Sequence, residues 1–342
     1  MKKVLLITDT WAPQVNGVVN TWKNILNYSK FNNMKIEIIH PFLFSNFSWP
    51  FYKEIRIPIV RYKTVVNMIQ QINPDHIHIA TEGILGWHAR NYCLKNNYLF
   101  STSYHTKFPE FLSSLYGVPK KITYKVIKTF HNASKSTLVN TPTMKNELSS
   151  RGFNNLLEWT RGVDKDVFRP RIDEGIKKIL NPKNKEKIII YVGRISKEKN
   201  LINLCKIIKR LSNYQFVFVG DGPLKNKLSK ENSEIIFTGY KFGEELSKYY
   251  SNADCSVFPS MNDTFGNTIL ESISCGTPVA AYPVNGPVDI IENEISGFCD
   301  ENLELAIYKS LKCDQKKILN SIEKYTWQNC FEIFKNQLLK LT

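Results

Sequence analysis

The sequence predicts an α/β protein with two domains, each built around a doubly wound parallel sheet. Its 342 residues exceed the length at which a single hydrophobic core usually stops growing, roughly 250–300 residues. Short apolar runs typical of buried strands alternate with helical patterns along the whole chain, as they do in α/β folds. The runs also form two sets, separated by a stretch rich in lysine and asparagine.

The expected strands and the domain boundaries follow from these runs. In the first half they cover residues 4–8, 36–40, 76–80, 99–103 and 136–140, and in the second half residues 187–192, 215–219, 235–238, 253–258 and 278–281. Residues 161–186 read as the connection, so we expect domains at 1–165 and 170–325. After Trp327, the residues Phe331, Phe334, Leu338 and Leu341 recur at helical spacing. This pattern predicts a closing helix over 326–342 that packs back on the N-terminal domain.

The composition is that of an ordinary soluble globular protein, with 42% hydrophobic and 23% charged residues. No apolar run approaches the ~20 residues needed to span a bilayer. The apolar run 4–7 ends at Thr8 and Asp9, too early for a signal peptide, so it is expected to be a strand. The expected location is therefore the cytoplasm or the inner face of the cytoplasmic membrane. Seven scattered cysteines without a C-x-x-C pair indicate reduced structural thiols.

The positive charge is concentrated in the first half of the chain. Residues 1–170 contain 22 Lys and Arg against 10 Asp and Glu, a net charge of +12, whereas the remaining residues contribute +3 to the total of +15. Such asymmetry indicates an anionic partner, either nucleic acid or a membrane surface. A genome biased towards lysine would raise the charge everywhere and would not segregate it.

Glycine-containing loops after strands are the first candidate ligand sites. The segment 10–19 follows the first expected strand and precedes a helix, and Gly17 would let the backbone approach a phosphate at the helix N-terminus. This loop lacks the G-x-G-x-x-G spacing of a dinucleotide site, which counts against a dehydrogenase. By itself, an Asn-Gly pair after a strand is more often a simple turn.

Two cations follow a buried strand in the second half. Gly193 and Arg194 end the run 187–192, and Lys199 comes five residues later. Ligands of parallel α/β sheets bind at the carboxyl ends of the strands. An arginine and a lysine at this position suit a diphosphate whose negative charge grows as it leaves. The segment 219–223, with the sequence V-G-D-G-P, forms another strand-to-turn junction.

Two carboxylates eight residues apart, Asp263 and Glu271, flank a glycine turn and a helix start. One acid could bind the hydroxyls of a sugar ring while the other binds a ribose. Free N–H groups around Gly266, Asn267 and Thr268 would meet phosphate oxygens.

These motifs together resemble family 4 glycosyltransferases over nearly the whole chain. The resemblance rests on Gly193-Arg194 with Lys199, on the G-D-G-P turn, and on D-T-F-G-N-T-I-L-E followed by C-G-T-P-V. The opening T-D-T-W-A-P-Q-V-N-G-V-V and the segment 102–106 resemble the acceptor domain of the same family. The nearest resemblance is to GDP-mannose-dependent α-mannosyltransferases and to sulfoquinovosyl- and glucosyl-diacylglycerol synthases.

The resemblance implies a GT-B fold, in which two Rossmann-like domains face each other across a cleft and the last helix returns to the N-terminal domain. It also implies transfer with retained anomeric configuration, no metal, and no cofactor besides the nucleotide-sugar donor. The donor would be UDP-glucose, UDP-glucuronate or GDP-mannose.

By the same resemblance, Gly17 would contact the donor phosphate and His105 would reach the outer hydroxyls of the donor sugar. Arg194 and Lys199 would neutralise the diphosphate, and Phe265 belongs to the donor-binding motif together with the residues up to Thr268. Asp263 and Glu271 would form the E-x7-E pair. The first acid of that pair is Asp in this chain, one methylene shorter than the usual Glu, which leaves the donor hexose open.

A basic amphipathic helix is expected between residues 118 and 135. Lys121, Lys125 and Lys128 share one helical stripe, Lys120 lies beside it, and Ile122, Val126 and Phe130 occupy the neighbouring face. Aromatic residues are interleaved, a pattern typical of an interfacial membrane anchor. A core helix with a solvated lysine face would give a similar pattern, and the +12 of this domain favours the membrane.

Other polar residues carry no functional pattern. His40, His76, His78, His88 and His131 are expected to be structural. Asp164 and Asp166 match a D-x-D metal motif superficially, but they lie in the connection, so we expect loop capping and no metal site.

The sequence therefore predicts a glycosyltransferase that works at a membrane surface and moves a hexose onto a lipid, with diacylglycerol as the first choice of acceptor. A soluble or polyprenyl-linked saccharide is the alternative acceptor. A nucleic-acid-binding protein would leave the donor motifs unexplained, and a catalytically silent nucleotide-sugar binder is disfavoured because the predicted catalytic residues are present. Nucleic acid is not expected as a partner, and a monomer or weak dimer is expected.

Overall fold

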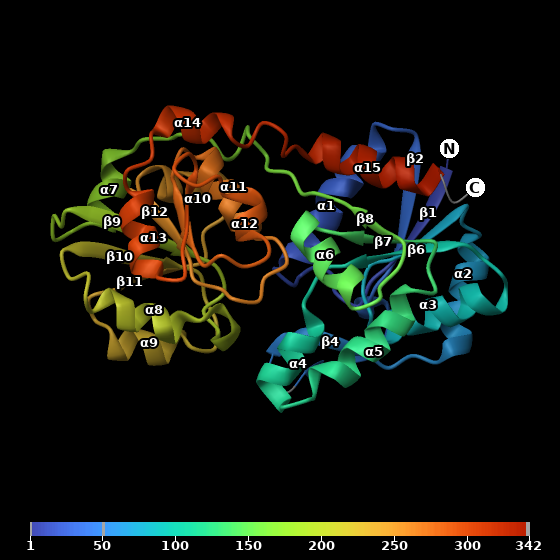
Figure 1. Cartoon of the computed structure of the whole chain (residues 1–342). Coiled ribbons are helices and arrows are strands. Elements are labelled where there is room, and N and C mark those ends of the chain that lie inside the picture. The colour runs from blue at the N-terminus through green and yellow to red at the C-terminus, as the bar shows by residue number, and fades with distance from the viewer. Residues whose placement is uncertain (1, 50–51, 340–342) are drawn as a thin grey trace. The chain divides into compact units, whose positions relative to one another are not determined.

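The computed structural model describes residues 2–49 and 52–339 and divides them into two compact units (Figure 1). The first unit contains the chain up to Arg161 together with the segment from Trp327 onwards, and the second unit runs from Gly162 to Thr326. The chain thus enters the second unit directly after Arg161, where the sequence analysis set the start of the connection. Leu341, part of the expected pattern of the last helix, lies outside the described residues.

The first unit is built on a six-stranded parallel sheet in the order β2-β1-β5-β6-β7-β8. Strands β1 and β5 bury nearly all of their side chains, as expected for a parallel sheet covered on both faces. The strands are β1 (Lys2–Ile7), β2 (Met34–Ile39), β5 (His76–Ile79), β6 (Phe100–Tyr104), β7 (Ser136–Val139) and β8 (Leu156–Glu158). The strand order reverses between β1 and β5.

Helices and one hairpin complete this unit. The hairpin pairs β3 (Asn46–Trp49) with β4 (Tyr52–Pro58), and a short 3-10 turn, Pro41–Leu43, precedes it. The helices are α1 (Gly17–Lys30), α2 (Tyr62–Ile72), α3 (Ile84–Lys95), α4 (Phe108–Tyr116), α5 (Lys120–His131), α6 (Pro142–Ser150) and α15 (Trp327–Leu339).

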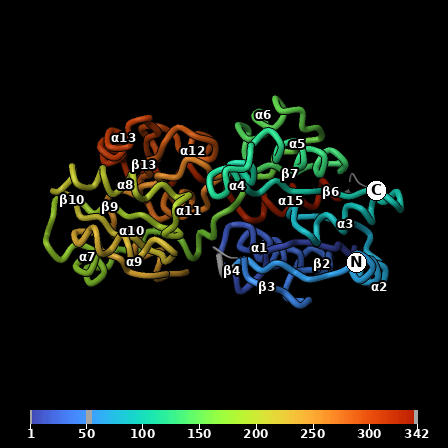
Figure 2. The backbone as a smooth tube through the Cα atoms, turned by 90° about the horizontal axis from the view of Figure 1, so that it is seen from below, coloured from blue at the N-terminus to red at the C-terminus, as the bar shows by residue number. Residues whose placement is uncertain are grey.

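The C-terminal helix α15 lies within the first unit (Figures 1 and 2). Its buried residues Trp327, Phe331 and Phe334 pack in one cluster with Trp22 of α1 and with β1. The Nε1 atom of Trp159 also donates a hydrogen bond of 2.8 Å to the carbonyl of Cys330. The helical spacing of the aromatic residues therefore reflects a face that is buried against the N-terminal sheet.

The second unit contains another six-stranded parallel sheet, in the order β11-β10-β9-β12-β13-β14. Numbered within the unit, this is the 3-2-1-4-5-6 order of dinucleotide-binding folds, and it reverses between β9 and β12. The strands are β9 (Lys187–Val192), β10 (Tyr214–Val219), β11 (Ile236–Gly239), β12 (Cys255–Phe258), β13 (Val279–Ala281) and β14 (Gly297–Cys299).

The helices of the second unit cover both faces of its sheet. They are α7 (Glu174–Leu180), α8 (Leu201–Ile208), α9 (Lys225–Glu231), α10 (Gly243–Ser251), α11 (Asn267–Ser274), α12 (Pro287–Ile290), α13 (Leu303–Ser310) and α14 (Gln315–Asn320), with a 3-10 turn at Lys197–Lys199. In the part of the chain that the structure describes, no helix is both long and apolar enough to cross a bilayer. The predicted α/β architecture with two parallel sheets is confirmed.

Candidate active site

The predicted donor residues of the second unit gather where its strand order reverses. Gly193 and Arg194 follow β9 directly, and Lys199 ends the short turn after them. Asp263 lies in the loop between β12 and α11, and β12 is the neighbour of β9 on the other side of the reversal. Since ligands of open α/β sheets bind outside the carboxyl ends of strands at such a switch point, the topology places these groups at a ligand site.

Lys199 and Asp263 form an ion pair across this point. The Nζ atom of Lys199 lies 2.7 Å from Oδ1 and 2.8 Å from Oδ2 of Asp263, and both side chains are one-quarter exposed. The sequence analysis assigned the lysine to a diphosphate and the acid to a sugar hydroxyl, without a link between them. A partly exposed pair of this kind contributes only about 0–1 kcal/mol to stability. Lys199 can therefore exchange its partner for a phosphate at little cost.

The loop that carries Arg194 is held by its own strand and by the G-D-G-P turn. The Tyr191 hydroxyl donates a hydrogen bond of 2.8 Å to the Arg194 carbonyl. Gly220 has a φ of +146°, and a Cβ at this position would lie 1.9 Å from the carbonyl oxygen of Gly193. The turn therefore needs glycine because the two loops touch through their backbones.

Glu271 is a half-buried carboxyl on α11. Its Oε2 accepts a hydrogen bond of 3.2 Å from the Tyr250 hydroxyl on α10. Burial raises the pKa of Glu271 to about 7, although the hydrogen bond from Tyr250 opposes this shift. Near neutral pH the side chain can thus act either as a carboxylate that accepts hydroxyl hydrogen bonds or as a neutral acid.

The N-terminus of α11 is left open by its capping residue. Gly266, the N-cap with a φ of +105°, has no side chain to accept hydrogen bonds from the first-turn N–H groups of Asn267 and Thr268. These N–H groups are therefore suited to phosphate oxygens, as predicted. Phe265 differs from the other motif residues because its ring is 95% buried and packs edge-on against Tyr325. Only its main chain could serve a ligand.

In the first unit, Gly17 is exposed and is the first residue of α1. The helix is capped by Asn16, whose side chain accepts a hydrogen bond of 3.0 Å from the N–H of Val19. The same amide donates a hydrogen bond of 3.0 Å to Thr10. The loop after β1 is thus held by side-chain hydrogen bonds, and the N–H of Gly17 lies at the helix start.

His105 follows β6 and is held by a buried arginine. Arg161 donates from Nη2 to Nδ1 of His105 at 3.1 Å and from the same atom to the Oδ1 of Asn140. Because Nδ1 accepts, the ring proton lies on Nε2, which makes Nε2 a hydrogen-bond donor. Burial and the charge of Arg161 hold the pKa of His105 well below its usual range. His105 is therefore a neutral donor, suited to a sugar oxygen.

Arg161 is a functional candidate that the sequence analysis missed. It is 2% exposed, and its guanidinium stacks 4.2 Å from the ring of Trp159 and donates 2.8 Å to the Trp159 carbonyl. Burial lowers its pKa to about 10, so the group stays charged at neutral pH. In the sequence it stands at the start of the connection, and no local pattern links it to a histidine 56 positions earlier.

The four lysines of the basic helix α5 have different surroundings. Lys121 and Lys125 are exposed. The Nζ atom of Lys128 donates a hydrogen bond of 3.4 Å to the carbonyl of Arg151, and that of Lys120 lies 3.9 Å from Glu110. The exposed part of the predicted stripe is therefore Lys121 and Lys125, with exposed Lys120 beside it, while Lys128 lies partly against α6.

The apolar residues beside the stripe are also divided. Ile122 is 60% exposed and Val126 is 48% exposed, whereas Phe130 is fully buried. Tyr124 and Ile127 form the rest of the buried face. Exposed aliphatic side chains thus lie beside exposed lysines, a combination that suits an interface between water and lipid.

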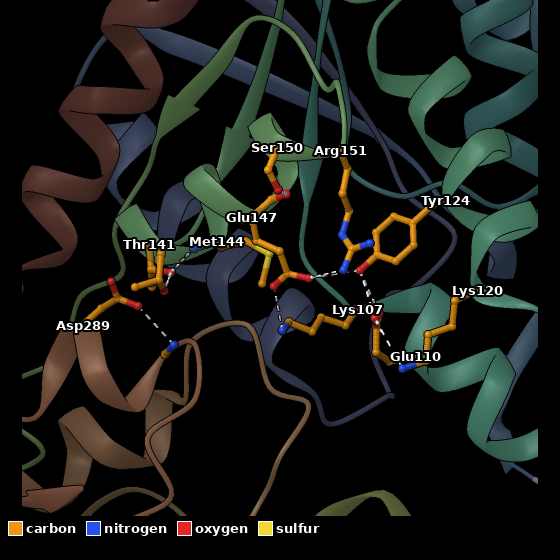
Figure 3. Close-up of polar contacts among 12 residues, drawn as sticks. Lys107, Glu110, Lys120, Tyr124, Thr141, Met144, Glu147, Ser150, Arg151 and Asp289 are labelled. Atoms are coloured by element: carbon orange, nitrogen blue, oxygen red, sulfur yellow. Dashed lines mark hydrogen bonds and ion pairs between the residues drawn. The ribbon is translucent and has the colours of Figure 1, made fainter.

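A charged network ties α5 to the helices on either side (Figure 3). Glu147 of α6 accepts hydrogen bonds from Lys107 at 3.0 Å and from Arg151 at 3.1 Å. The Tyr124 hydroxyl lies between Glu147, at 3.3 Å, and Glu110 of α4, at 3.0 Å. The guanidinium of Arg151 covers the Tyr124 ring at 4.1 Å. The network fixes how α5 presents its exposed face.

The D-x-D sequence of the connection caps its own turn. The Oδ1 of Asp164 accepts hydrogen bonds from the N–H groups of Asp166, at 3.0 Å, and Val167, at 3.3 Å. Across residues 2–49 and 52–339, no three His, Cys, Asp or Glu side chains gather closely enough to hold a metal ion.

Comparison with known protein families gives two matches that together cover most of the chain. Residues 21–167 match the family described as Glycosyltransferase Family 4, and residues 173–312 match Glycosyl transferases group 1. This chain belongs to the family 4 glycosyltransferases of the GT-B fold. The enzyme is therefore a hexosyltransferase that uses a nucleotide sugar.

Several characterised relatives share its sequence. The chain is 29% identical over 313 residues to a GDP-mannose-dependent alpha-mannosyltransferase of Corynebacterium glutamicum, which covers 86% of this chain and 76% of the relative. It is 30% identical over 260 residues to the sulfoquinovosyl transferase SQD2 of Arabidopsis thaliana, covering 74% of this chain and 51% of that protein. An alpha-monoglucosyldiacylglycerol synthase of Streptococcus pneumoniae is 26% identical over 82% of this chain and 71% of its own length.

Solved structures show the same fold. Sucrose-phosphate synthase of Thermosynechococcus elongatus superposes with a TM-score of 0.81 at 16% identity, over 100% of this chain and 99% of the other. Anabaena HepE in complex with UDP-glucose gives a TM-score of 0.74 at 13% identity, over 99% of this chain and all of the other.

Proposed function

We propose that this transferase moves a hexose from a nucleotide sugar to the hydroxyl of diacylglycerol at an anionic membrane surface, with retention of configuration and without a metal. The observation that carries the lipid acceptor is the exposed face of α5, where the exposed aliphatic residues Ile122 and Val126 lie beside the exposed lysines Lys121 and Lys125. Two of the named relatives support it, since one is a sulfoquinovosyl transferase and another makes glucosyldiacylglycerol.

In the proposed reaction, the bond between the anomeric carbon and the diphosphate breaks and a bond to the acceptor oxygen forms. Arg194 and Lys199 neutralise the diphosphate as it leaves, and the N–H groups at the start of α11 bind its oxygens. The acceptor proton passes to the leaving phosphate. Before the donor binds, Lys199 is held by Asp263, so donor binding exchanges this ion pair for a phosphate contact and releases Asp263 towards a sugar hydroxyl.

The remaining groups recognise the donor. Glu271 accepts hydrogen bonds from the ribose hydroxyls, and the neutral His105 donates from Nε2 to an outer hydroxyl of the hexose. Gly17 offers a backbone N–H to the donor phosphate. Since the lipids of the cytoplasmic leaflet are the anionic ones, we place the enzyme on the inner face of the cytoplasmic membrane.

The acceptor can be tested directly. The purified enzyme is incubated with anionic vesicles that contain diacylglycerol, and with UDP-glucose, UDP-glucuronate or GDP-mannose in parallel. Mass spectrometry of the extracted lipids should show diacylglycerol carrying one added sugar with one of these donors. The similarity to GDP-mannose-dependent mannosyltransferases favours a saccharide as the second candidate, so methyl α-mannoside is included as a competing acceptor. A glycosylated mannoside without any glycolipid would contradict the lipid acceptor.

A further inference from the structure

The first unit has a carboxylate at the switch point of its own sheet. Its strand order reverses between β1 and β5, and Glu82 follows β5 closely. Ligands of open α/β sheets bind outside the carboxyl ends of strands at such a reversal. Glu82 therefore lies where this unit is expected to bind a ligand, and the donor residues assigned above do not include it.

A fully buried histidine holds this carboxylate. His131, the last residue of α5, is 0% exposed, and its Nε2 lies 2.9 Å from Oε1 of Glu82. Its Nδ1 lies 2.9 Å from the Thr102 hydroxyl on β6. The Glu82 side chain is 14% exposed, and no described residue donates a hydrogen bond to its other oxygen. His131 thus cannot touch a dissolved ligand, whereas Glu82 can.

The backbone around Glu82 is fixed by the neighbouring strand. A Cβ at Gly83 would lie 2.3 Å from the carboxyl carbon of Asp9, so Gly83 allows close contact between the two loops. Asp9 in turn accepts hydrogen bonds from Thr81, at 2.9 Å, and from the N–H of Leu85, at 2.8 Å. The carboxylate of Glu82 is therefore presented by a preorganised loop.

The histidine is fixed from the other side. Arg90 of α3 donates hydrogen bonds to the carbonyls of Thr129, at 2.9 Å, and Phe130, at 3.2 Å, at the C-terminus of α5. These contacts join the helix that follows Glu82 to the helix that ends in His131. A rigid pair of this kind is typical of a carboxylate that must keep one orientation.

A buried tyrosine packs near the histidine of this pair. Tyr104 ends β6 and is 0% exposed, and none of the described residues forms a hydrogen bond with its hydroxyl. Its ring centroid lies 5.8 Å from that of His131, and burial raises the pKa of Tyr104 well above the usual range. Because Tyr104 is as buried as His131, it cannot touch a dissolved ligand either, and of these three residues Glu82 alone can reach the acceptor.

We infer that Glu82 binds a hydroxyl of the acceptor and that His131 is a positioning residue that acts only through Glu82. The inference rests on the proposed function, because it assigns Glu82 to the molecule that receives the hexose. The chemistry of the group supports this division. A carboxylate accepts hydrogen bonds from hydroxyls and repels phosphates, so it suits a neutral hydroxyl compound better than a diphosphate.

The first test compares Glu82→Gln with Glu158→Gln. Glu158 ends β8 at the same edge of the sheet. It is exposed and pairs with partly exposed Lys145 at 3.1 Å, so it serves as a matched control for the same substitution. Dioctanoylglycerol is the acceptor, because it dissolves without a bilayer and separates acceptor binding from membrane binding. If the wild type glycosylates only methyl α-mannoside, that sugar is used as the acceptor in place of dioctanoylglycerol.

Glu82→Gln should raise the KM for the acceptor about 10- to 100-fold, the usual effect of losing a charged hydrogen bond. The Kd for the nucleoside diphosphate, measured by calorimetry without acceptor, should stay at the wild-type value. Glu158→Gln should have the wild-type KM for the acceptor and the wild-type Kd for the nucleoside diphosphate. An unchanged acceptor KM in Glu82→Gln, or an equal loss of nucleotide affinity, would overturn the inference. A wild type that consumes no nucleotide sugar would instead refute the proposed function.

The role of His131 is tested in two backgrounds. His131→Phe removes the donor to Glu82 and should raise the acceptor KM, while His131→Gln, which keeps an N–H donor, should recover part of the loss. In the Glu82→Gln background, His131→Phe should change the acceptor KM by less than about 2-fold, because coupled residues are not additive. A full additional loss in that background would show that His131 has only a structural role.

Discussion

Glu271 shows how burial prepares a single residue for recognition. Its carboxyl lies next to the Tyr250 hydroxyl, and burial raises its pKa to about 7. A ribose hydroxyl needs an acceptor, and the ionised carboxylate offers more acceptor sites than the neutral acid. Binding of the nucleotide should therefore favour deprotonation of Glu271.

Because the nucleotide favours the ionised form of Glu271, donor binding should depend on pH. Affinity should rise as the pH increases from 6 to 8 through the pKa of about 7, because the fraction of ionised Glu271 grows. Glu271→Gln should bind both the nucleotide sugar and the free nucleoside diphosphate more weakly and should lose this dependence. Calorimetric titrations at the two pH values measure both effects.

Asp263→Asn provides the contrast to Glu271→Gln. This variant should weaken binding of the intact sugar nucleotide more than binding of the bare nucleotide. Tighter binding at pH 6 than at pH 8 by the wild type would contradict the ribose role of Glu271. Equal losses for both ligands in Asp263→Asn would contradict the assignment of Asp263 to the sugar.

Contacts between site residues that are distant in the sequence could not be predicted from the sequence. Each donor residue could be proposed from its motif, but the ion pair between Lys199 and Asp263 joins positions 64 apart and has no local signature. The same holds for the contact between Arg161 and His105 and for that between His131 and Glu82. A buried polar side chain takes its partner from the tertiary fold, so its role becomes visible only in the structure.

At the scale of elements, helix α5 was expected from its lysine stripe, but the sequence did not show which of its apolar residues are buried. The structure buries Tyr124, Ile127 and Phe130 and leaves Ile122 and Val126 exposed. The periodicity of a sequence shows that a helix has a polar and an apolar face. Which apolar residues remain exposed to solvent depends on how the helix packs against its neighbours. The strands β8 and β14 have only three residues each and were missed, whereas the equally short β13 was predicted because it lies in the apolar stretch 278–281. The hairpin β3–β4 was missed as well.

The exposed face of α5 should bind anionic vesicles. Each basic residue near such a surface contributes ~1 kcal/mol, so replacing Lys121 and Lys125 with Glu should weaken partitioning at least about 30-fold. Co-sedimentation with phosphatidylserine-containing vesicles at low and high salt measures how much of the enzyme partitions onto the vesicles. Nucleotide affinity should stay unchanged, since the predicted nucleotide site belongs to the other unit.

The matched control for this helix replaces Lys316 and Lys317, two exposed lysines of α14, with Glu. The net charge changes equally, but these lysines lie outside the basic half of the chain, so vesicle binding should be kept. If the wild-type enzyme does not sediment with anionic vesicles even at low salt, α5 is not a membrane anchor.

At the scale of the whole molecule, the charge distribution follows the division of labour that we propose. The half with the motifs for the donor is nearly neutral, and the half that carries α5 and Glu82 has the excess of +12. The alternating pattern and the motifs were enough to predict two parallel sheets and the family. The positions of the switch points depend on strand order, which no strand reveals by itself.

The central claim is that a nucleotide sugar is activated by the cations of this chain, without a metal. The most direct measurement is the rate of nucleoside diphosphate release during transfer, in excess chelator, for the wild type and for the Arg194→Ala/Lys199→Ala double variant. The wild type should keep its rate in chelator, and the folded double variant should lose at least about 10²- to 10³-fold in kcat, the effect of removing one transition-state charge contact. Loss of wild-type turnover in chelator with recovery on added manganese, or near-wild-type turnover in the double variant, would contradict the account.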